Sequence, residues 1–172
     1  LVLLLVSLLF IGTPFLLSYW IYRFIKRKQY DSKYRFIAII PLLVVGYFLI
    51  EAIYPSETFY RVDFKEVTGI ELVSTAYFHH KDASYPDIHG DYTSVAIVEV
   101  GSYFYEKLSG HLLENGFVED NRRMGGSEMT LAFKRLDGKK IIREFSKNDS
   151  DKFYYIAFLS DKESILIQRT SW

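Results

Sequence analysis

Residues 152–159 read KFYYIAFL and residues 164–170 read SILIQRT, and the expected architecture of the C-terminal part of the chain is built around this pair. Both runs are short and rich in β-branched and aromatic residues, which favours strands. Residues 160–163, SDKE, suit a hairpin loop between them. The pair predicts two antiparallel neighbours, with Tyr154 and Tyr155 facing opposite sides of the sheet.

Four further strands are expected before this hairpin along the chain. The stretch SVAIVEV alternates apolar and polar residues almost strictly, which is typical of a strand with one buried face. An Asp137-Gly138 pair is a strong hairpin signal between two of the runs. The four expected strands cover residues 74–80, 92–100, 129–135 and 139–145.

Two helices are expected among these strands. Gly101-Ser102 supplies an N-cap, apolar residues then recur every four positions, and Asn115-Gly116 closes the turn. A shorter helix is expected over 63–68, because Asp63 and Glu66 have capping-box spacing and Gly69 favours a left-handed stop. The order of elements predicts an α+β domain over 56–172, a mainly antiparallel sheet covered by one helix.

The N-terminal part has the composition of a membrane hairpin. Residues 1–22 carry no charge and residues 36–54 carry one acid, Glu51, near their end. A 22-residue helix is about 33 Å long, which covers a hydrocarbon core of roughly 30 Å. Two transmembrane helices are therefore expected within a domain of residues 1–55.

The loop 23–35 predicts how this hairpin is oriented. It holds all six basic residues of the N-terminal part, and loops rich in Lys and Arg stay in the cytoplasm. A cleaved signal peptide is disfavoured, since its basic residues would precede the apolar run. We expect a multi-pass protein of a bacterial inner membrane with residues 56–172 in the periplasm.

The charge balance also changes between residues 1–55 and residues 56–172, and it argues against nucleic acid as a partner. Residues 1–55 contain six basic and two acidic side chains, whereas residues 56–172 contain 15 basic and 19 acidic ones. Nucleic-acid binding needs a concentrated basic face, which an acidic exported domain does not offer. The chain has no cysteine, so disulfide scaffolds and Cys-type zinc sites are also excluded.

The densest polar segment is residues 79–92, HHKDASYPDIHGDY. It contains three of the four histidines, so a site for zinc or a similar ion has to be considered, although the spacing matches no known motif. The simpler interpretation is a turn in which Asp87 or Asp91 bonds backbone amides. A partner-binding role is compatible with that turn, and its candidate residues are Asp82, Tyr85, Asp87, His89, Asp91 and Tyr92.

Enzyme motifs are absent from the rest of the chain. There is no Gly-x-Ser-x-Gly elbow, phosphate loop, dinucleotide fingerprint or His-Glu-x-x-His pair. The sequence therefore predicts a protein that is not an enzyme, with no cofactor and no assigned metal ligand.

The segment 81–87 with 89–92, following DFKEVTG at 63–69, resembles parts of small two-span bacterial envelope proteins of unassigned function. The layout of the chain is similar to that of membrane-anchored immunity proteins, which neutralise toxins in the periplasm. That likeness implies a partner-binding domain held at the bilayer, and it assigns no catalytic residue.

The leading hypothesis is a membrane-anchored periplasmic domain that binds another protein, a toxin or an envelope protein, without catalysis. In the immunity version, acidic groups at 82–91 and 119–120 meet a basic toxin surface and block it by occlusion. The alternatives are a metal-dependent or hydrolytic enzyme using the 79–91 loop, and an envelope-complex subunit whose spans pair through Gly12 and Gly46. The oligomeric state stays open.

Overall fold

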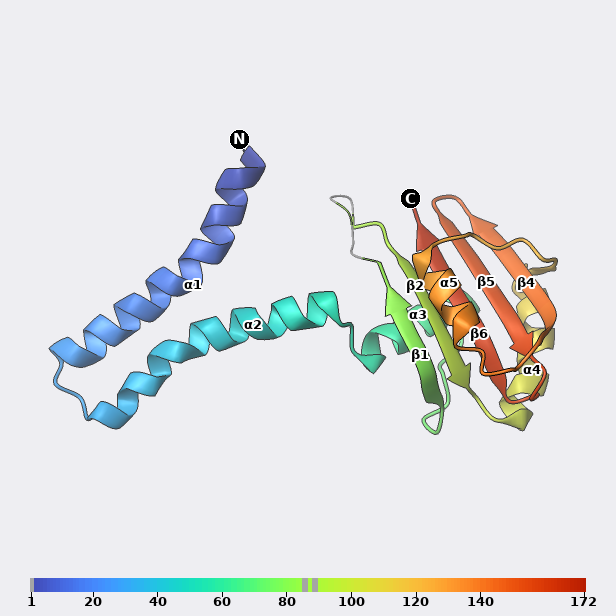
Figure 1. The fold of residues 1–172 in the computed structure, drawn as a ribbon, viewed down its shortest axis with the longest axis horizontal. Coiled ribbons are helices and arrows are strands. Elements are labelled where there is room, and N and C mark those ends of the chain that lie inside the picture. The colour runs from blue at the N-terminus through green and yellow to red at the C-terminus, as the bar shows by residue number, and fades with distance from the viewer. Residues whose placement is uncertain (1, 85–86, 88–89) are drawn as a thin grey trace. The chain divides into compact units, whose positions relative to one another are not determined.

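The computed structural model describes residues 2–84, 87 and 90–172 (Figure 1). The chain forms two compact units, Leu1–Tyr54 and Pro55–Trp172. Among the described residues there are five α-helices, one 3₁₀ helix and six strands.

The first unit contains three helical segments. The helix α1 covers Val2–Arg27 and contains Pro14, the 3₁₀ helix η1 covers Ser32–Ile39, and α2 covers Ile40–Ile53. Pro41 stands in the first turn of α2, where a missing backbone N–H removes no helical hydrogen bond.

One segment of the first unit has the length and hydropathy of a membrane span. Among the described residues, this segment is Ser32–Glu51. Signal sequences and the core helices of soluble proteins share this length and hydropathy. The other expected span, 1–22, falls partly outside the described residues, so the prediction of two spans is not confirmed.

The second unit is an α+β domain, as predicted. Its six-stranded sheet has the order β1-β2-β6-β5-β4-β3, and each neighbouring pair is antiparallel. The strands are β1 Tyr77–Ala83, β2 Thr93–Glu99, β3 Val118–Glu119, β4 Ile141–Asp149, β5 Lys152–Leu159 and β6 Ser164–Ser171. The helices are α3 Glu57–Thr68, α4 Ser102–Glu114 and α5 Ser127–Lys134.

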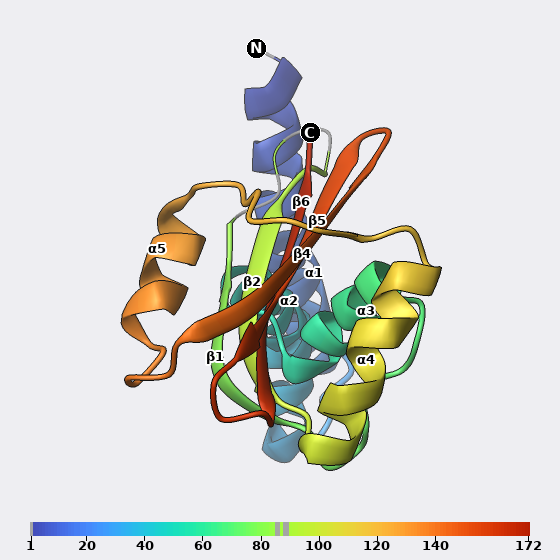
Figure 2. The ribbon, with the colours of Figure 1, turned by 90° about the vertical axis from the view of Figure 1, so that its right-hand side faces the viewer.

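Helices cover both faces of the sheet, so the expectation of one covered face was wrong. Figure 2 shows α3 and α4 on one side of the strands and α5 on the other. The physical reason lies in β5, which is buried along nearly its whole length and whose successive residues belong in turn to one core cluster and then to the other. Tyr154 belongs to the hydrophobic cluster under α3 and α4, and Tyr155 to the cluster under α5. Both rings are buried, at 5% and 0% exposure.

The segment 129–135, predicted as a strand, lies within and just after α5. Met129 and Ala132 are buried and Phe133 is half-buried, which is helical spacing of three and four residues. The turn signal that follows was sound, because Asp137 and Gly138 both have positive φ, at 50° and 81°. This turn joins a helix to β4 instead of joining two strands.

The short helix predicted over 63–68 is the second half of α3, which begins at Glu57 with Ser56 as its N-cap residue. The predicted stop is confirmed, since Gly69 has φ of 77° and its N–H bonds the Lys65 carbonyl at 2.8 Å. The capping-box interpretation was wrong, because Asp63 is a buried residue of the helix interior.

Candidate functional site

The turn between β1 and β2, here called the acidic turn and comprising residues 82–92, is held at its base by hydrogen bonds. Thr93 N–H donates to the Ser84 hydroxyl and Ser84 N–H to the Thr93 carbonyl, both at 2.8 Å. Farther out, Asp91 N–H donates to Asp87 Oδ1 at 3.0 Å, and Asp87 N–H to the Asp91 carbonyl at 2.9 Å. This pattern confirms the predicted turn, in which Asp87 bonds a backbone amide.

The six predicted partner residues are distributed unevenly in this turn. Asp87 is exposed, whereas Asp82 and Asp91 are half-buried. Tyr85 and His89 lie outside the described residues. Gly90 has φ of 85°, a left-handed conformation that other residues adopt only with strain.

Tyr92, the sixth, anchors the turn to the domain. Its hydroxyl donates to Asp63 Oδ1 at 2.7 Å, and the Arg169 guanidinium lies 4.2 Å from the centre of its ring. Its N–H donates to the Ser171 hydroxyl at 3.0 Å. These contacts engage both the polar and the apolar parts of the side chain, so Tyr92 positions the turn and offers little surface to a partner.

The acceptor of the Tyr92 hydrogen bond belongs to a buried polar cluster that the sequence did not reveal. Asp63, 5% exposed on α3, accepts hydrogen bonds from Tyr92 and from the Ser94 hydroxyl on β2. Burial raises the pKa of Asp63, and these two hydrogen bonds and the charge of Arg169 oppose that rise. Burial also raises the pKa of Tyr92, so its hydroxyl keeps the proton that it donates.

Glu66, one helical turn beyond Asp63, ties α3 to β5 and β6. Its Oε1 accepts from Lys152 Nζ at 2.9 Å, from the Tyr154 hydroxyl at 3.1 Å and from Arg169 Nε at 3.2 Å. Burial alone would raise the pKa of Glu66, but the bond from Lys152 and the charge of Arg169 bring it below its ordinary value. Arg169 thus lies between Glu66 and the ring of Tyr92, which links the base of the acidic turn to α3.

Asp63 and Glu66 give stability opposite dependences on pH. The folded state raises the pKa of Asp63, so its contribution falls as pH rises from 3.8 through the raised pKa. It lowers the pKa of Glu66, so that contribution is full above pH 4.5 and is lost as pH falls. Urea unfolding between pH 3 and 7 should show the stability difference between wild type and Asp63→Asn shrinking with rising pH, and that between wild type and Glu66→Gln growing. Slopes of the same sign would contradict this assignment.

The histidines of the 79–91 segment do not converge among the described residues. His79 Nε2 lies 2.9 Å from Glu99 Oε2, next to a register shift between Phe78 and His80. His80 Nε2 is buried without a hydrogen-bond partner in the described chain, and burial lowers the pKa of His80. The described residues include no group of three or more His, Cys, Asp or Glu arranged to hold a metal ion.

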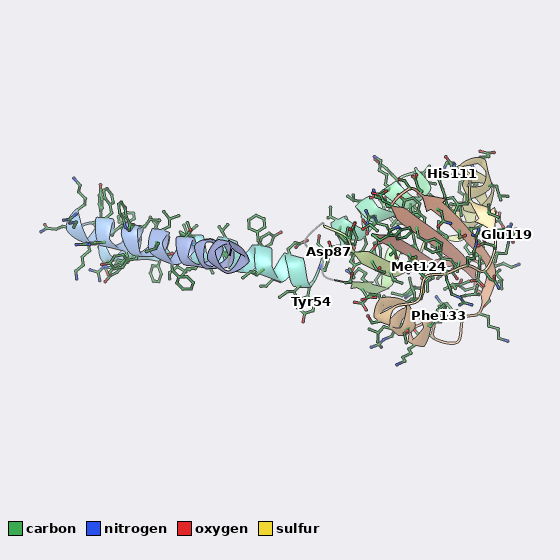
Figure 3. All side chains as sticks on the ribbon, turned by 90° about the horizontal axis from the view of Figure 1, so that it is seen from above. Tyr54, Asp87, His111, Glu119, Met124 and Phe133 are labelled. Carbon is green, nitrogen blue, oxygen red and sulfur yellow. The ribbon has the colours of Figure 1, made fainter. Side chains whose placement is uncertain are left out.

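The other predicted acidic patch, Glu119 and Asp120, lies at the opposite edge of the sheet. Both oxygens of Glu119 accept from Arg143, at 2.8 and 2.9 Å, and Asp120 pairs with Arg122 at 2.6 Å. The sheet order places β1 and β3 five strand spacings apart, roughly 24 Å. Figure 3 shows Asp87 and Glu119 at opposite ends of the domain. The structure therefore does not bring the two acidic patches together.

Comparison with known proteins gives no relative. Neither the family models, nor the curated proteins, nor the solved structures contain a match.

Proposed function

We propose that this chain is a membrane-anchored extracytoplasmic domain that binds another protein through its acidic turn and catalyses no reaction. The observation that carries the proposal is a turn that presents carboxylates from a fixed base. Tyr92, Asp63 and Arg169 hold this base, while Asp87 is exposed at the outer end. A turn whose base is fixed before binding loses less conformational entropy when a partner docks.

Membrane anchoring is supported by the segment Ser32–Glu51. Leu43, Phe48 and Ile50 are 65%, 64% and 63% exposed. Apolar side chains that the chain leaves uncovered are stable in lipid and unfavourable in water. The basic loop 23–35 favours a cytoplasmic location for the N-terminal end of this segment. In this proposal the segment crosses the inner membrane and the second unit lies on the periplasmic side.

The attachment is short, because only three residues, 54–56, lie between the end of α2 and the start of α3. Those residues reach at most about 3.6 Å each, so the domain is tethered near the bilayer surface. A short tether suits capture of a partner that acts at or near the membrane.

The partner that this turn fits is a protein with a basic surface. Residues 56–172 carry four more acidic than basic side chains, and Asp82, Asp87 and Asp91 concentrate negative charge in one turn. Complementary charge increases the association rate and selects among partners. In the immunity-type version of the proposal, this turn alone covers the toxin, since Glu119 and Asp120 belong to the far edge and are already paired.

Site-directed photo-crosslinking in membranes of the native host tests the proposal. A photoreactive amino acid at position 87 of the full-length chain should give one discrete adduct, at least fivefold stronger than the same probe at position 106. Glu106 is the matched control, an exposed acid on α4. Adding Asp91→Lys, or raising the salt concentration, should weaken the adduct at position 87, because both reduce electrostatic steering.

Equal adducts at positions 87 and 106 would mean that the acidic turn is not the contact surface. Stoichiometric metal that leaves the purified protein on His89→Ala would replace the proposal with the metal-dependent enzyme hypothesis.

A further inference from the structure

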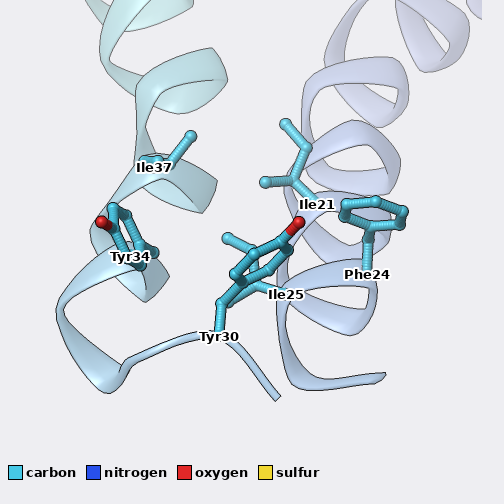
Figure 4. A pocket seen from close by; sticks show the side chains of 6 residues that line it. All are labelled: Ile21, Phe24, Ile25, Tyr30, Tyr34 and Ile37. Atoms are coloured by element: carbon cyan, nitrogen blue, oxygen red, sulfur yellow. The ribbon is translucent and has the colours of Figure 1, made fainter. Parts of the chain in front are cut away.

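Two cavities border the contact between α1 and η1 in the first unit. One has a volume of about 400 Å³ and is lined by Ile21, Phe24 and Ile25 of α1 together with Tyr30, Tyr34 and Ile37 (Figure 4). Its walls are almost entirely hydrocarbon and aromatic ring. The volume lies within the range of about 300–1,000 Å³ that is typical of ligand pockets.

The second cavity, of about 490 Å³, is lined by polar and by apolar residues. Ser32 and Arg35 of η1 are polar residues of this lining, whereas Ala38 of η1 and Leu42 of α2 are apolar and lie farther along the chain. From Arg35 to Leu42 the helical rise is roughly 10–14 Å. That length runs from the interface of a bilayer into the depth of its acyl chains, since half a hydrocarbon core is about 15 Å.

Two polar groups of the second cavity lack partners among the described residues. The Ser18 hydroxyl is buried and has no hydrogen-bond partner there, and Arg35, whose side chain is exposed, forms no ion pair with the described residues. Unsatisfied polar groups at membrane depth are unfavourable unless a ligand or lipid supplies the missing partner. An arginine and a hydroxyl donor together match the phosphate and ester oxygens of a phospholipid.

The charge around both cavities selects the kind of lipid. The loop 23–35 holds six basic side chains and one acid, Asp31, which pairs with Lys33 at 3.3 Å. Clusters of basic residues beside a membrane span attract anionic headgroups. A zwitterionic headgroup would bring its own cation close to Arg35 and its basic neighbours.

We infer that the turn of this hairpin binds an anionic phospholipid, with the phosphate at Arg35, an ester oxygen at Ser18 and acyl chains in the two cavities. The inference rests on the proposed membrane anchoring. It adds a ligand to the anchor and is independent of the protein partner at the acidic turn. A bound anionic lipid would fix η1 against α1 at the cytoplasmic surface.

Native mass spectrometry of the full-length chain tests this inference. The protein, purified in neutral detergent, is mixed with equal amounts of phosphatidylglycerol and phosphatidylcholine carrying identical acyl chains. The wild type should retain phosphatidylglycerol at least fivefold over phosphatidylcholine. Arg35→Gln should lower this preference about fivefold, because that is the effect expected when one basic contact to an anionic lipid is lost.

Two further variants separate a built site from diffuse attraction. Lys28→Gln removes the same charge from the same loop at a residue that lines neither cavity, and it should keep the preference within twofold. Leu42→Trp should fill the second cavity and reduce retention of both lipids, with the headgroup preference of the remaining bound fraction preserved.

Equal retention of the two lipids by the wild type, or equal losses in Arg35→Gln and Lys28→Gln, would overturn the inference. Because this measurement uses no protein partner, its failure leaves the crosslinking result at position 87 intact. A failure of that crosslinking would likewise leave the lipid preference unchanged.

Discussion

Replacing Leu108 by alanine should lower the free energy of unfolding of fragment 55–172 by about 2–5 kcal/mol. Leu108 is 1% exposed on α4 and belongs to the cluster that joins α3 and α4 to the sheet. The shorter side chain removes buried hydrocarbon and leaves a cavity that the strands cannot fill. A domain of this size is stable by only about 5–15 kcal/mol, so the loss is a large fraction of the total.

Urea denaturation followed by circular dichroism measures this effect. Leu113→Ala is the matched control, because Leu113 lies on the same helix and is 50% exposed. The control should change stability by less than about 0.5 kcal/mol. Equal shifts in the two variants would show that the assigned buried face of α4 is wrong.

Asp63→Ala should destabilise the same fragment by about 3 kcal/mol. The substitution leaves the hydroxyls of Tyr92 and Ser94 without their acceptor, and Ser94 is 4% exposed. A hydrogen bond to a charged group contributes about 1.5–3 kcal/mol, and burying an unpaired donor carries a further penalty. Burial of the Asp63 carboxylate is unfavourable and raises its pKa. Replacing Asp63 by alanine removes this desolvation penalty, which offsets part of the loss in stability.

The comparison with Asp63→Asn identifies the cause. Asparagine keeps a carbonyl oxygen for one hydroxyl, so Asp63→Asn should be milder than Asp63→Ala. Glu106→Ala, on the exposed face of α4, should be close to neutral. A hydrogen-exchange measurement should show the acidic turn less protected in Asp63→Ala, because Tyr92 loses its anchor. Unchanged hydrogen-exchange protection of the acidic turn would show that Asp63 does not stabilise the turn.

The sequence predicted those elements whose signals are local. Three elements were predicted correctly, because each has a sustained pattern bounded by turn residues. They are the strands over 152–159 and 164–170 and the helix after Gly101. The turn around Asp87 was also predictable, since its hydrogen bonds join residues within the same turn.

The errors occurred where a short segment fits two patterns. MTLAFKR contains Thr and Phe, which favour a strand, yet Met129 and Ala132 meet the sheet as one helical face. Seven residues are too few for periodicity to distinguish a helix from a strand. The helix is favoured because its apolar side chains cover the second face of β5. The need to cover that face is a tertiary effect, which local sequence patterns do not show.

The polar cluster could not be predicted for a different reason. Asp63 and Glu66 were assigned to a helix start from their spacing, but their partners are Ser94, Lys152 and Arg169. These residues are 31, 86 and 103 positions away from the acids that they contact. Such contacts follow from strand order, which the sequence left open, and the same order separates Glu119 from the acidic turn.

Topology reporters test most directly whether the domain is displayed outside the cytoplasm. Alkaline phosphatase, active in the periplasm, and a fluorescent protein that matures in the cytoplasm should each be fused after Lys28 and after Trp172. Two spans with a basic loop inside predict fluorescence for the Lys28 fusion and phosphatase activity for the Trp172 fusion. Phosphatase activity after Lys28 with fluorescence after Trp172, or both fusions reporting the same side, would contradict the proposed anchoring and display.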